Sequence, residues 1–296
     1  MIRILGTILA ALLGLAFGSF LNVCLSRWPQ GESVVKPRSH CRNCGRTLLW
    51  WENVPLVSWI GLRGQCRTCK TKIGWRYPLV ELAVGVLWAV VGWRLFDQIL
   101  SPTTATLFAI GPPYFGFIPA LETMFFVLLL VGLAVLDAEH LWIADAATLP
   151  GIALGLAIPI FQESITGMLP KIQSEFWVGL EERLLAIIAA GGIILLIRWS
   201  YRLIRKREGI GLGDAKLMAM LGAWLGLPGA LLSLAVGVLL GTLFSLIVLA
   251  IPAMRRESDT WQLSKLPLGT FICVGGIISV FWGPAIIAAY EHLVGL

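Results

Sequence analysis

Charged residues are scarce in this 296-residue chain. Only 14% of its residues are charged and 57% are hydrophobic, whereas soluble globular proteins carry about 25% charged residues. The uncharged residues form long runs, and residues 4–25 and 228–253 contain no Asp, Glu, Lys or Arg. Each run is long enough to cross roughly 30 Å of hydrocarbon. The scarcity of charge therefore argues against an ordinary soluble domain and predicts a membrane protein.

Histidine is also rare, and the common nucleophile and metalloprotease motifs are missing. The three histidines (His40, His140 and His292) are scattered, and no His-Glu-x-x-His sequence occurs. No Ser–His or Cys–His arrangement suggests an activated nucleophile. Hydrolytic chemistry, if present, must therefore rest on other side chains.

The apolar runs predict an all-α polytopic protein with about eight membrane-spanning helices. Reading the runs and their interruptions places these helices near residues 4–26, 77–96, 118–137, 146–161, 180–199, 214–227, 229–252 and 268–290. The sixth segment is short, and Pro228-Gly229 is expected to form a tight turn before the seventh.

The positive charges predict the orientation of these helices. Most of the 23 lysine and arginine residues fall in segments 27–76, 198–216 and 253–265. The positive-inside rule places those segments in the cytoplasm and both termini in the periplasm. The net charge of +6 then reflects topology and contact with membrane lipid headgroups. Nucleic acid is not an expected partner, because no basic stripe with interleaved aromatic residues occurs, and no oligomeric state is predicted.

Four cysteines in segment 27–76 have the spacing of a zinc site. They form two C-x-x-C pairs, Cys41 with Cys44 and Cys66 with Cys69. Two such pairs complete a tetrahedral site of four thiolates, which is typical of structural zinc. Disulfide bonds are the alternative, but a cytoplasmic location disfavours them. Zinc would fold a loop that is too polar to build a large core.

Two aspartates lie at the ends of apolar runs. Asp137 ends one run and Asp214 begins another, and Gly211 and Gly213 precede Asp214, as does Gly209. The predicted topology places both acids at the cytoplasmic face of the membrane. Acidic residues at such positions are costly and often functional. The alternative is that each pairs with a nearby cation such as Lys216 as an interfacial anchor.

Two carboxyl groups in a low-dielectric site suit hydrolysis with a shared proton. Like charges close together cannot both ionise, so one group stays charged and activates water while the other stays protonated and polarises the carbonyl. Glycines before Asp214 are expected to let the backbone adopt unusual dihedral angles and let an extended substrate approach. A transporter that relays protons or cations through the same acids is a second interpretation.

At this point the sequence resembles a known family. The stretches GSFLNVCLSRWP, NVPLVSWIGLRGQC, RYPLVE, LDAEHLWIAD and GIGLGDAKL, together with the cysteine pairs, are similar to those of the type IV prepilin peptidases. Members of that family are bifunctional leader peptidases and N-methyltransferases of the bacterial inner membrane and belong to the GxGD aspartyl proteases. They cut the basic leader of prepilins or type II secretion pseudopilins after a glycine, at the cytoplasmic face. They then methylate the new N-terminus with S-adenosylmethionine.

The resemblance implies roles for particular residues. It places the catalytic pair at Asp137 and Asp214 and the zinc ligands at the four cysteines. It also implies four parts of the chain: a first membrane helix (1–26), a zinc-binding and methyltransferase domain (27–78), a second helix with an outer loop (79–117), and a six-helix peptidase domain (118–296). Two positions depart from the family pattern, since Ala144 and Thr270 stand where proline is usual.

Three further acids are candidates for supporting roles. Glu139 and Asp145 share the first acidic motif with Asp137, and their charge is a possible attraction for a basic leader; solvated loop charge is the alternative. Cleavage that is unaffected by charge reversal at either residue would count against steering. Glu81, at the start of the second predicted helix, is a candidate base for methyl transfer or a partner of Arg76. No G-x-G-x-x-G motif marks a methyl-donor site. Peptidase activity alone, with the zinc loop serving as a scaffold, is the alternative.

Overall fold

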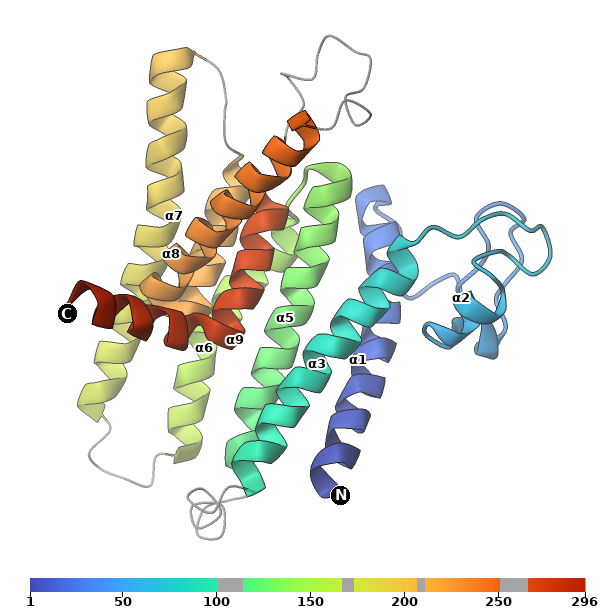
Figure 1. The fold of residues 1–296 in the computed structure, drawn as a ribbon, viewed down its shortest axis with the longest axis horizontal. Helices are drawn as coiled ribbons and strands as arrows, with labels where there is room; N and C mark the ends of the chain where they lie inside the picture. Colours follow the sequence, from blue (N-terminus) through green and yellow to red (C-terminus); the bar gives the residue numbers. More distant parts are fainter. Residues whose placement is uncertain (101–113, 167–172, 207–210, 251–265, 296) are drawn as a thin grey trace. The chain divides into compact units, whose positions relative to one another are not determined.

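The fold is all-helical across the described part of the chain (Figure 1). The computed structural model describes residues 1–100, 114–166, 173–206, 211–250 and 266–295. Gly209 and the basic segment 253–265 lie outside these residues. The helices are α1 (Ile2–Arg27), η1 (Trp28–Gln30), η2 (Trp50–Asn53), α2 (Val57–Gly61), α3 (Arg76–Leu100), α5 (Tyr114–His140), α6 (Asp145–Thr166), α7 (Gln173–Arg205), α8 (Leu212–Ala250) and α9 (Leu268–Val294). No strand occurs in these residues, and the β-structure is limited to two isolated bridges.

Five of the eight predicted membrane helices each correspond to one long apolar helix of the structure, namely α1, α3, α5, α7 and α9. Among the described residues, six helices are long and apolar enough to cross a bilayer: α1, α3, α5, α7, α8 and α9. The predicted fourth segment is α6, whose described apolar part, Asp145–Ala157, is shorter. The predicted sixth and seventh segments together form α8. The prediction of an all-α polytopic membrane protein is confirmed.

The break within α8 differs in position from the predicted turn. Gly226 has φ 68° and ψ 178°, while Pro228 and Gly229 are helical. A proline is tolerated in the first turn of a helix, where its missing N–H would have no partner. The chain therefore breaks before Pro228 rather than at it, and glycine supplies the positive φ that this requires.

The chain divides into two compact units, Met1–Gly132 and Leu133–Leu296, here called the N-terminal and C-terminal units. In the N-terminal unit α1 and α3 pack along each other (Figure 1). A Cβ at Gly14 would lie 2.8 Å from the carbonyl oxygen of Val84, and one at Gly18 would lie 2.8 Å from Cα of Glu81. Small residues thus allow the two backbones to approach closely, as is common between membrane helices. Residues 28–75 connect α1 to α3 and are here called the zinc module, because they contain the four predicted zinc ligands.

In the C-terminal unit α8 packs against α6, α7 and α9. A Cβ at Gly222 would lie 2.6 Å from the carbonyl oxygen of Ala186 in α7, and one at Gly237 would lie 2.9 Å from Cα of Ile272 in α9. These contacts bring α8 close to α7 at Gly222 and to α9 at Gly237. The last turns of α5, from Leu133 to His140, also belong to this unit.

Candidate functional site

Asp137 lies in the last turn of α5 and is buried, with 6% of its surface exposed. Its Oδ2 accepts a 2.7 Å hydrogen bond from the backbone N–H of Thr270, at the start of α9. The Thr270 hydroxyl lies 3.2 Å from the same oxygen and 2.9 Å from the carbonyl oxygen of Ala134, and it can donate its proton to either. The beginning of α9 therefore holds this carboxyl group in place.

Asp214 lies in the first turn of α8 and is also buried, with 8% exposed. Its Oδ2 accepts a 3.1 Å hydrogen bond from the backbone N–H of Gly211. Gly211 directly precedes α8, so the carboxyl group reaches back to the start of its own helix, as the third residue of a capping box does. A carboxylate at a helix N-terminus also interacts favourably with the helix dipole.

The structure brings the two aspartates into one site within the C-terminal unit. Ile143 connects their surroundings, because a Cβ at Gly213 would lie 2.9 Å from Cβ of Ile143, and one at Gly269 would lie 2.7 Å from its Cδ1. A Cβ at Gly269 would also lie 3.0 Å from Oδ2 of Asp137. The two carboxyl groups are close enough for their charges to interact. A pair of buried acids with interacting charges is the arrangement that shared-proton hydrolysis needs.

The glycines before Asp214 act by close approach rather than by unusual dihedral angles. Neither Gly211 nor Gly213 has a positive φ. The prediction of unusual dihedral angles is therefore wrong for these two glycines. The close contact between Gly213 and Ile143 instead requires a residue without Cβ. Glycine at this position lets the loop before α6 lie against the start of α8.

Adding a methyl group at Gly213 is expected to damage the site. Gly213→Ala should destabilise the protein by about 1–3 kcal/mol, because the added carbon overlaps Ile143, and should also slow any reaction of the aspartates. The matched control is Gly192→Ala in α7, where a Cβ would meet nothing within 4 Å. Thermal unfolding of both variants in detergent checks this. Equal stability of the two would contradict the packing.

The other acids of the first motif lie outside this buried pair. Asp145, the first residue of α6, is exposed and receives Lys216 Nζ at 2.7 and 2.8 Å. Glu139 is exposed, with His140 Nε2 at 3.9 Å. Lys216 therefore pairs with Asp145, and in the part of the chain that the structure describes neither buried aspartate forms an ion pair with it. Lys216, the cation suggested for an interfacial anchor, is therefore not the partner of Asp214.

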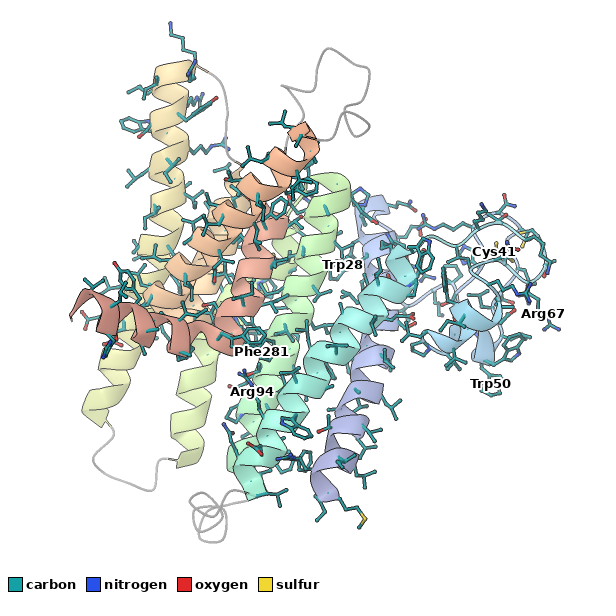
Figure 2. The ribbon with its side chains drawn as sticks, in the orientation of Figure 1. Trp28, Cys41, Trp50, Arg67, Arg94 and Phe281 are labelled. Atoms are coloured by element: carbon teal, nitrogen blue, oxygen red, sulfur yellow. The ribbon has the colours of Figure 1, made fainter. Side chains whose placement is uncertain are left out.

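The four predicted zinc ligands form a cluster in the N-terminal unit. The Sγ atoms of Cys41, Cys44, Cys66 and Cys69 all lie within 4.8 Å of one another. The thiols of Cys41 and Cys69 are 3.6 Å apart, close to the roughly 3.8 Å expected between sulfurs of a tetrahedral zinc site with Zn–S bonds of about 2.3 Å. Figure 2 shows Cys41 on the same small module as Trp50 and Arg67. The donor set and its spacing fit structural zinc.

The two cysteine pairs have the same backbone geometry. In the first, Cys41 N–H donates to Arg46 O at 2.9 Å and Gly45 N–H donates to Cys41 O at 2.8 Å. In the second, Cys66 and Lys70 make the corresponding bonds at 2.9 and 3.0 Å. Gly45 and Lys70 both have positive φ, 69° and 58°. Each pair is therefore a tight knuckle that points two thiols to one side.

Polar contacts around the knuckles support the cluster. Hydrogen bonds from the Thr71 hydroxyl, the Thr71 backbone and Asn43 lower the pKa of Cys69 to about 5, which favours the thiolate that binds zinc. Arg46 Nη2 donates to Glu52 Oε1 at 2.6 Å, and Leu49 N–H donates to Oε2 at 2.8 Å. Burial opposes ionisation of Glu52, but these bonds outweigh it, and its pKa lies below the usual value.

Glu81 lies in the N-terminal unit, whereas Asp137 and Asp214 lie in the C-terminal unit. It is buried in α3 with 7% exposed, and its Oε2 accepts the N–H of Leu56 at 2.8 Å. Arg76 is not among its hydrogen-bond or ion-pair partners in the described residues. The alternative role of Glu81 as a structural partner of Arg76 is thus without a supporting contact among the described residues.

Two residues, Thr270 and Asn22, were not assigned a role from the sequence. Thr270 was noted as a departure from the family pattern, but its bonds to Asp137 join residues 133 positions apart, which no local pattern reveals. Asn22 carries a buried side chain in α1. The sequence does contain a signal for it, since Asn22 is an amide within the uncharged run 4–25 and polar groups in membrane helices often mark a site.

Comparisons with known proteins agree with this geometry. The bacterial peptidase A24 N-terminal domain matches residues 12–95, and the type IV leader peptidase family matches residues 124–246. A prepilin leader peptidase/N-methyltransferase of Stutzerimonas stutzeri is 33% identical, over 95% of this chain and 92% of the relative.

The chain belongs to the type IV leader peptidase family. Proteins of the same name from Burkholderia pseudomallei (strain 1026b) and Pseudomonas aeruginosa are 34% and 30% identical, over 93% and 96% of this chain and 84% and 93% of those relatives. No solved structure is significantly similar to the chain. Family membership and the apolar helices make it a multi-pass inner-membrane enzyme, and they favour the peptidase interpretation over transport.

Proposed function

We propose that this protein cleaves the leader peptide of prepilins or type II secretion pseudopilins and then methylates the new N-terminus. The supporting observation is the buried pair of Asp137 and Asp214 in a chain of the type IV leader peptidase family. The relatives named above are prepilin leader peptidase/N-methyltransferases. Their names are the reason for including both activities.

In the proposed hydrolysis the two aspartates have different protonation states. Asp137 accepts the Thr270 N–H and lies within reach of the Thr270 hydroxyl, whereas the one donor to Asp214 among the described residues is the Gly211 N–H. Hydrogen-bond donors favour the charged form of a carboxyl group. We therefore assign the negative charge to Asp137 and the proton to Asp214.

The proposed reaction follows from these protonation states. Asp137 takes a proton from water as the water oxygen attacks the scissile carbonyl carbon, and Asp214 donates its proton to the carbonyl oxygen. The tetrahedral intermediate then collapses as the Asp214 carboxylate takes back a hydroxyl proton, the carbon–nitrogen bond breaks, and the proton held by Asp137 passes to the leaving nitrogen. The leaving nitrogen becomes the free N-terminus of the mature substrate.

The membrane setting determines which peptide bond is reached. Asp137 ends one apolar helix and Asp214 begins another, so both lie at helix ends rather than in the middle of a span. With both termini in the periplasm, this end is the cytoplasmic face. A basic leader would lie in the cytoplasm there, near the exposed acids Glu139 and Asp145. The Lys216 pair reduces the charge that Asp145 can offer.

Two bound groups belong to this proposal. Zinc, held by the four cysteines, would order the module and take no part in hydrolysis. S-adenosylmethionine supplies a methyl group on a sulfonium. We assign its binding to the N-terminal unit, in which residues 27–78 would form the methyltransferase domain, and we assign hydrolysis to a peptidase domain of residues 118–296.

Purified protein with a synthetic prepilin tests both activities. We expect cleavage after the leader glycine without any cofactor. We also expect a methyl group on the product only when S-adenosylmethionine is present, as measured by mass spectrometry. Cleavage without methylation would leave the peptidase proposal intact and refute the second activity. Absence of cleavage with pilin and pseudopilin substrates would refute the first.

A further inference from the structure

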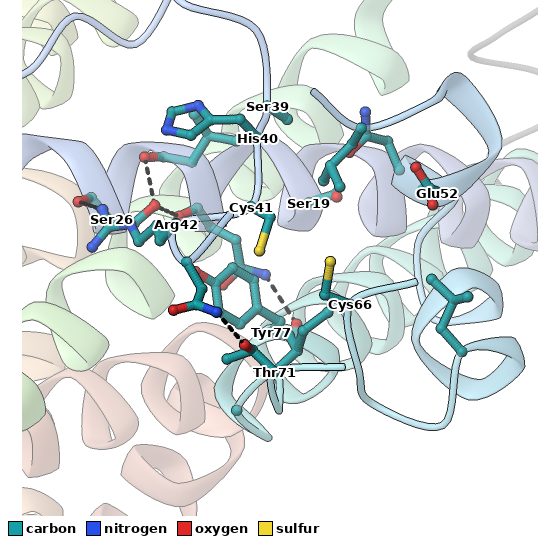
Figure 3. Close-up of a pocket in the computed structure, with 18 of the residues that line it drawn as sticks. Ser19, Ser26, Ser39, His40, Cys41, Arg42, Glu52, Cys66, Thr71 and Tyr77 are labelled. Atoms are coloured by element: carbon teal, nitrogen blue, oxygen red, sulfur yellow. Dashed lines mark hydrogen bonds between the residues drawn. The ribbon is translucent and has the colours of Figure 1, made fainter. Parts of the chain in front are cut away.

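A cavity in the N-terminal unit contains polar groups that no part of the hydrolysis uses (Figure 3). Its volume is about 770 Å³, within the range of small-molecule sites. It lies between the last turns of α1, the zinc module and the first turns of α3, and its lining includes Ser19, Asn22, Tyr77 and Glu81. Figure 3 shows Ser19, Cys41 and Tyr77 around it.

Asn22 leaves one acceptor unsatisfied at this cavity. The residue is 2% exposed, and its Nδ2 donates to the carbonyl oxygen of Tyr77 at 2.9 Å, which fixes the amide orientation. Its Oδ1 is buried and has no hydrogen-bond partner in the described residues. Leaving a buried acceptor without a donor is unfavourable, so a ligand with an N–H group would relieve this cost.

Glu81 adds a carboxyl group without a cation. Its oxygens accept hydrogen bonds from the Leu56 N–H and the Ser19 hydroxyl, and no described lysine or arginine forms an ion pair with it. The other buried acid of the cavity, Glu52, is paired with Arg46. Buried carboxylates are normally paired. A cationic ligand would complete this site.

We propose that Asn22 and Glu81 bind the N-terminal amino group of the cleaved substrate, which makes this cavity the methyl-acceptor site. The proposal rests on the proposed function, because it assumes that methylation follows cleavage. An ammonium group carries a positive charge that can pair with the Glu81 carboxylate. It also carries N–H groups that can donate a hydrogen bond to Asn22 Oδ1.

The depth of the two residues favours the substrate amine over the methyl donor. Asn22 and Glu81 each lie five residues inside the ends of α1 and α3, at Arg27 and Arg76, which is roughly 7 Å along the helix. A substrate that remains in the membrane after cleavage presents its first residue near this depth. The soluble donor would enter from the module side of the cavity, where His40, Arg42 and Lys72 line it.

The methyl transfer then has a balanced course. The carboxylate of Glu81 accepts a proton from the ammonium, which leaves a neutral amine. The amine nitrogen attacks the methyl carbon, and the carbon–sulfur bond breaks with its electron pair remaining on sulfur. The product is a secondary ammonium, which Asn22 Oδ1 and Glu81 can again hold by hydrogen bonds.

Binding of mature-substrate peptides tests the proposal without turnover. The full-length protein in nanodiscs, with S-adenosylhomocysteine present, is titrated with one peptide that has a free N-terminus and with the same peptide after N-acetylation. The wild type should prefer the free amine by about ten- to a hundredfold, as expected for hydrogen bonds to a charged group. Glu81→Gln and Asn22→Leu should each reduce this preference at least severalfold, and their affinity for S-adenosylhomocysteine should not change.

Glu32→Gln is the matched control, since Glu32 lines the same cavity but is exposed. It should keep the wild-type preference. Prepilin cleavage and zinc content in each variant report folding. An unchanged amine preference in Glu81→Gln would overturn the proposal, and so would loss of S-adenosylhomocysteine binding or loss of cleavage together with zinc. If the wild type bound amines selectively but never methylated them, the proposed methyltransferase function would be refuted, whereas the amine-binding site would stand.

Discussion

Asp137→Asn and Asp214→Asn are each expected to reduce prepilin cleavage by about a thousandfold or more, because general acid–base catalysis contributes roughly 10²–10⁴ for each group. Asparagine has nearly the same shape as aspartate, and its amide oxygen can still accept the Thr270 or Gly211 N–H. The fold should therefore survive. The asparagine side chain, however, cannot take a proton from water or donate one as a carboxylic acid does. The measurement is the cleavage rate of a synthetic prepilin with saturating enzyme.

The double variant sharpens this test. If the two carboxyl groups act as one unit, the Asp137→Asn/Asp214→Asn protein should be no slower than either single variant, because residues of one catalytic unit have non-additive effects. Asp145→Asn, in the same sequence motif but exposed and paired with Lys216, should lose less than about tenfold. Multiplicative losses in the double variant, or an equal loss in Asp145→Asn, would refute the assignment of the pair.

Removal of the metal is expected to unfold the zinc module and abolish methylation. Structural zinc in small domains contributes about 10–16 kcal/mol of binding free energy, and such domains are often unfolded without it. The module has no strands in its described residues and few buried side chains beyond Cys66 and Glu52, so little else can hold it. Chelation should raise amide hydrogen exchange throughout residues 39–73 and eliminate the amine preference of the cavity, whose lining includes the module.

Variants of the cysteines provide the control for chelation. Cys41→Ser or Cys66→Ser should lower the zinc content and reproduce the effects of the chelator. Cys24→Ala should not, because Cys24 lies in α1, outside the cluster. Helices α6 to α9, in the C-terminal unit, should keep their exchange protection in all cases. A module that stays protected without metal would show that the cluster is not a structural zinc site.

The sequence predicted the elements of this fold better than their contacts. Hydropathy placed the membrane helices correctly because an uncharged run in a bilayer has few alternatives to a helix. The break in α8 was placed two residues late, at Pro228, because a proline restricts the residues before it and is itself tolerated in a first turn. The role of Gly213 was also misjudged, since a sequence does not show that Ile143 lies against it.

The active-site pair was a prediction from the family motifs rather than from spacing. The hydropathy pattern identifies an acidic residue at the end of an apolar run, where burial of its charge is unfavourable. The pattern does not show which second acidic residue lies next to it. Glu139 and Asp145 were rivals in the sequence, and burial separates them from Asp137 in the structure. Thr270, across 133 positions, and the cavity of Asn22 and Glu81 depend on packing between distant segments. Such contacts require coordinates.

The most direct test of the account is the affinity for a prepilin peptide whose scissile amide is replaced by a hydroxyl-bearing tetrahedral carbon. If Asp137 and Asp214 hold one oxygen between them, the wild type should bind this peptide at least about a hundredfold more tightly than the same peptide without the hydroxyl, as transition-state analogues do. Either asparagine variant should lose that difference. Equal affinity of the wild type for the two peptides would contradict the account.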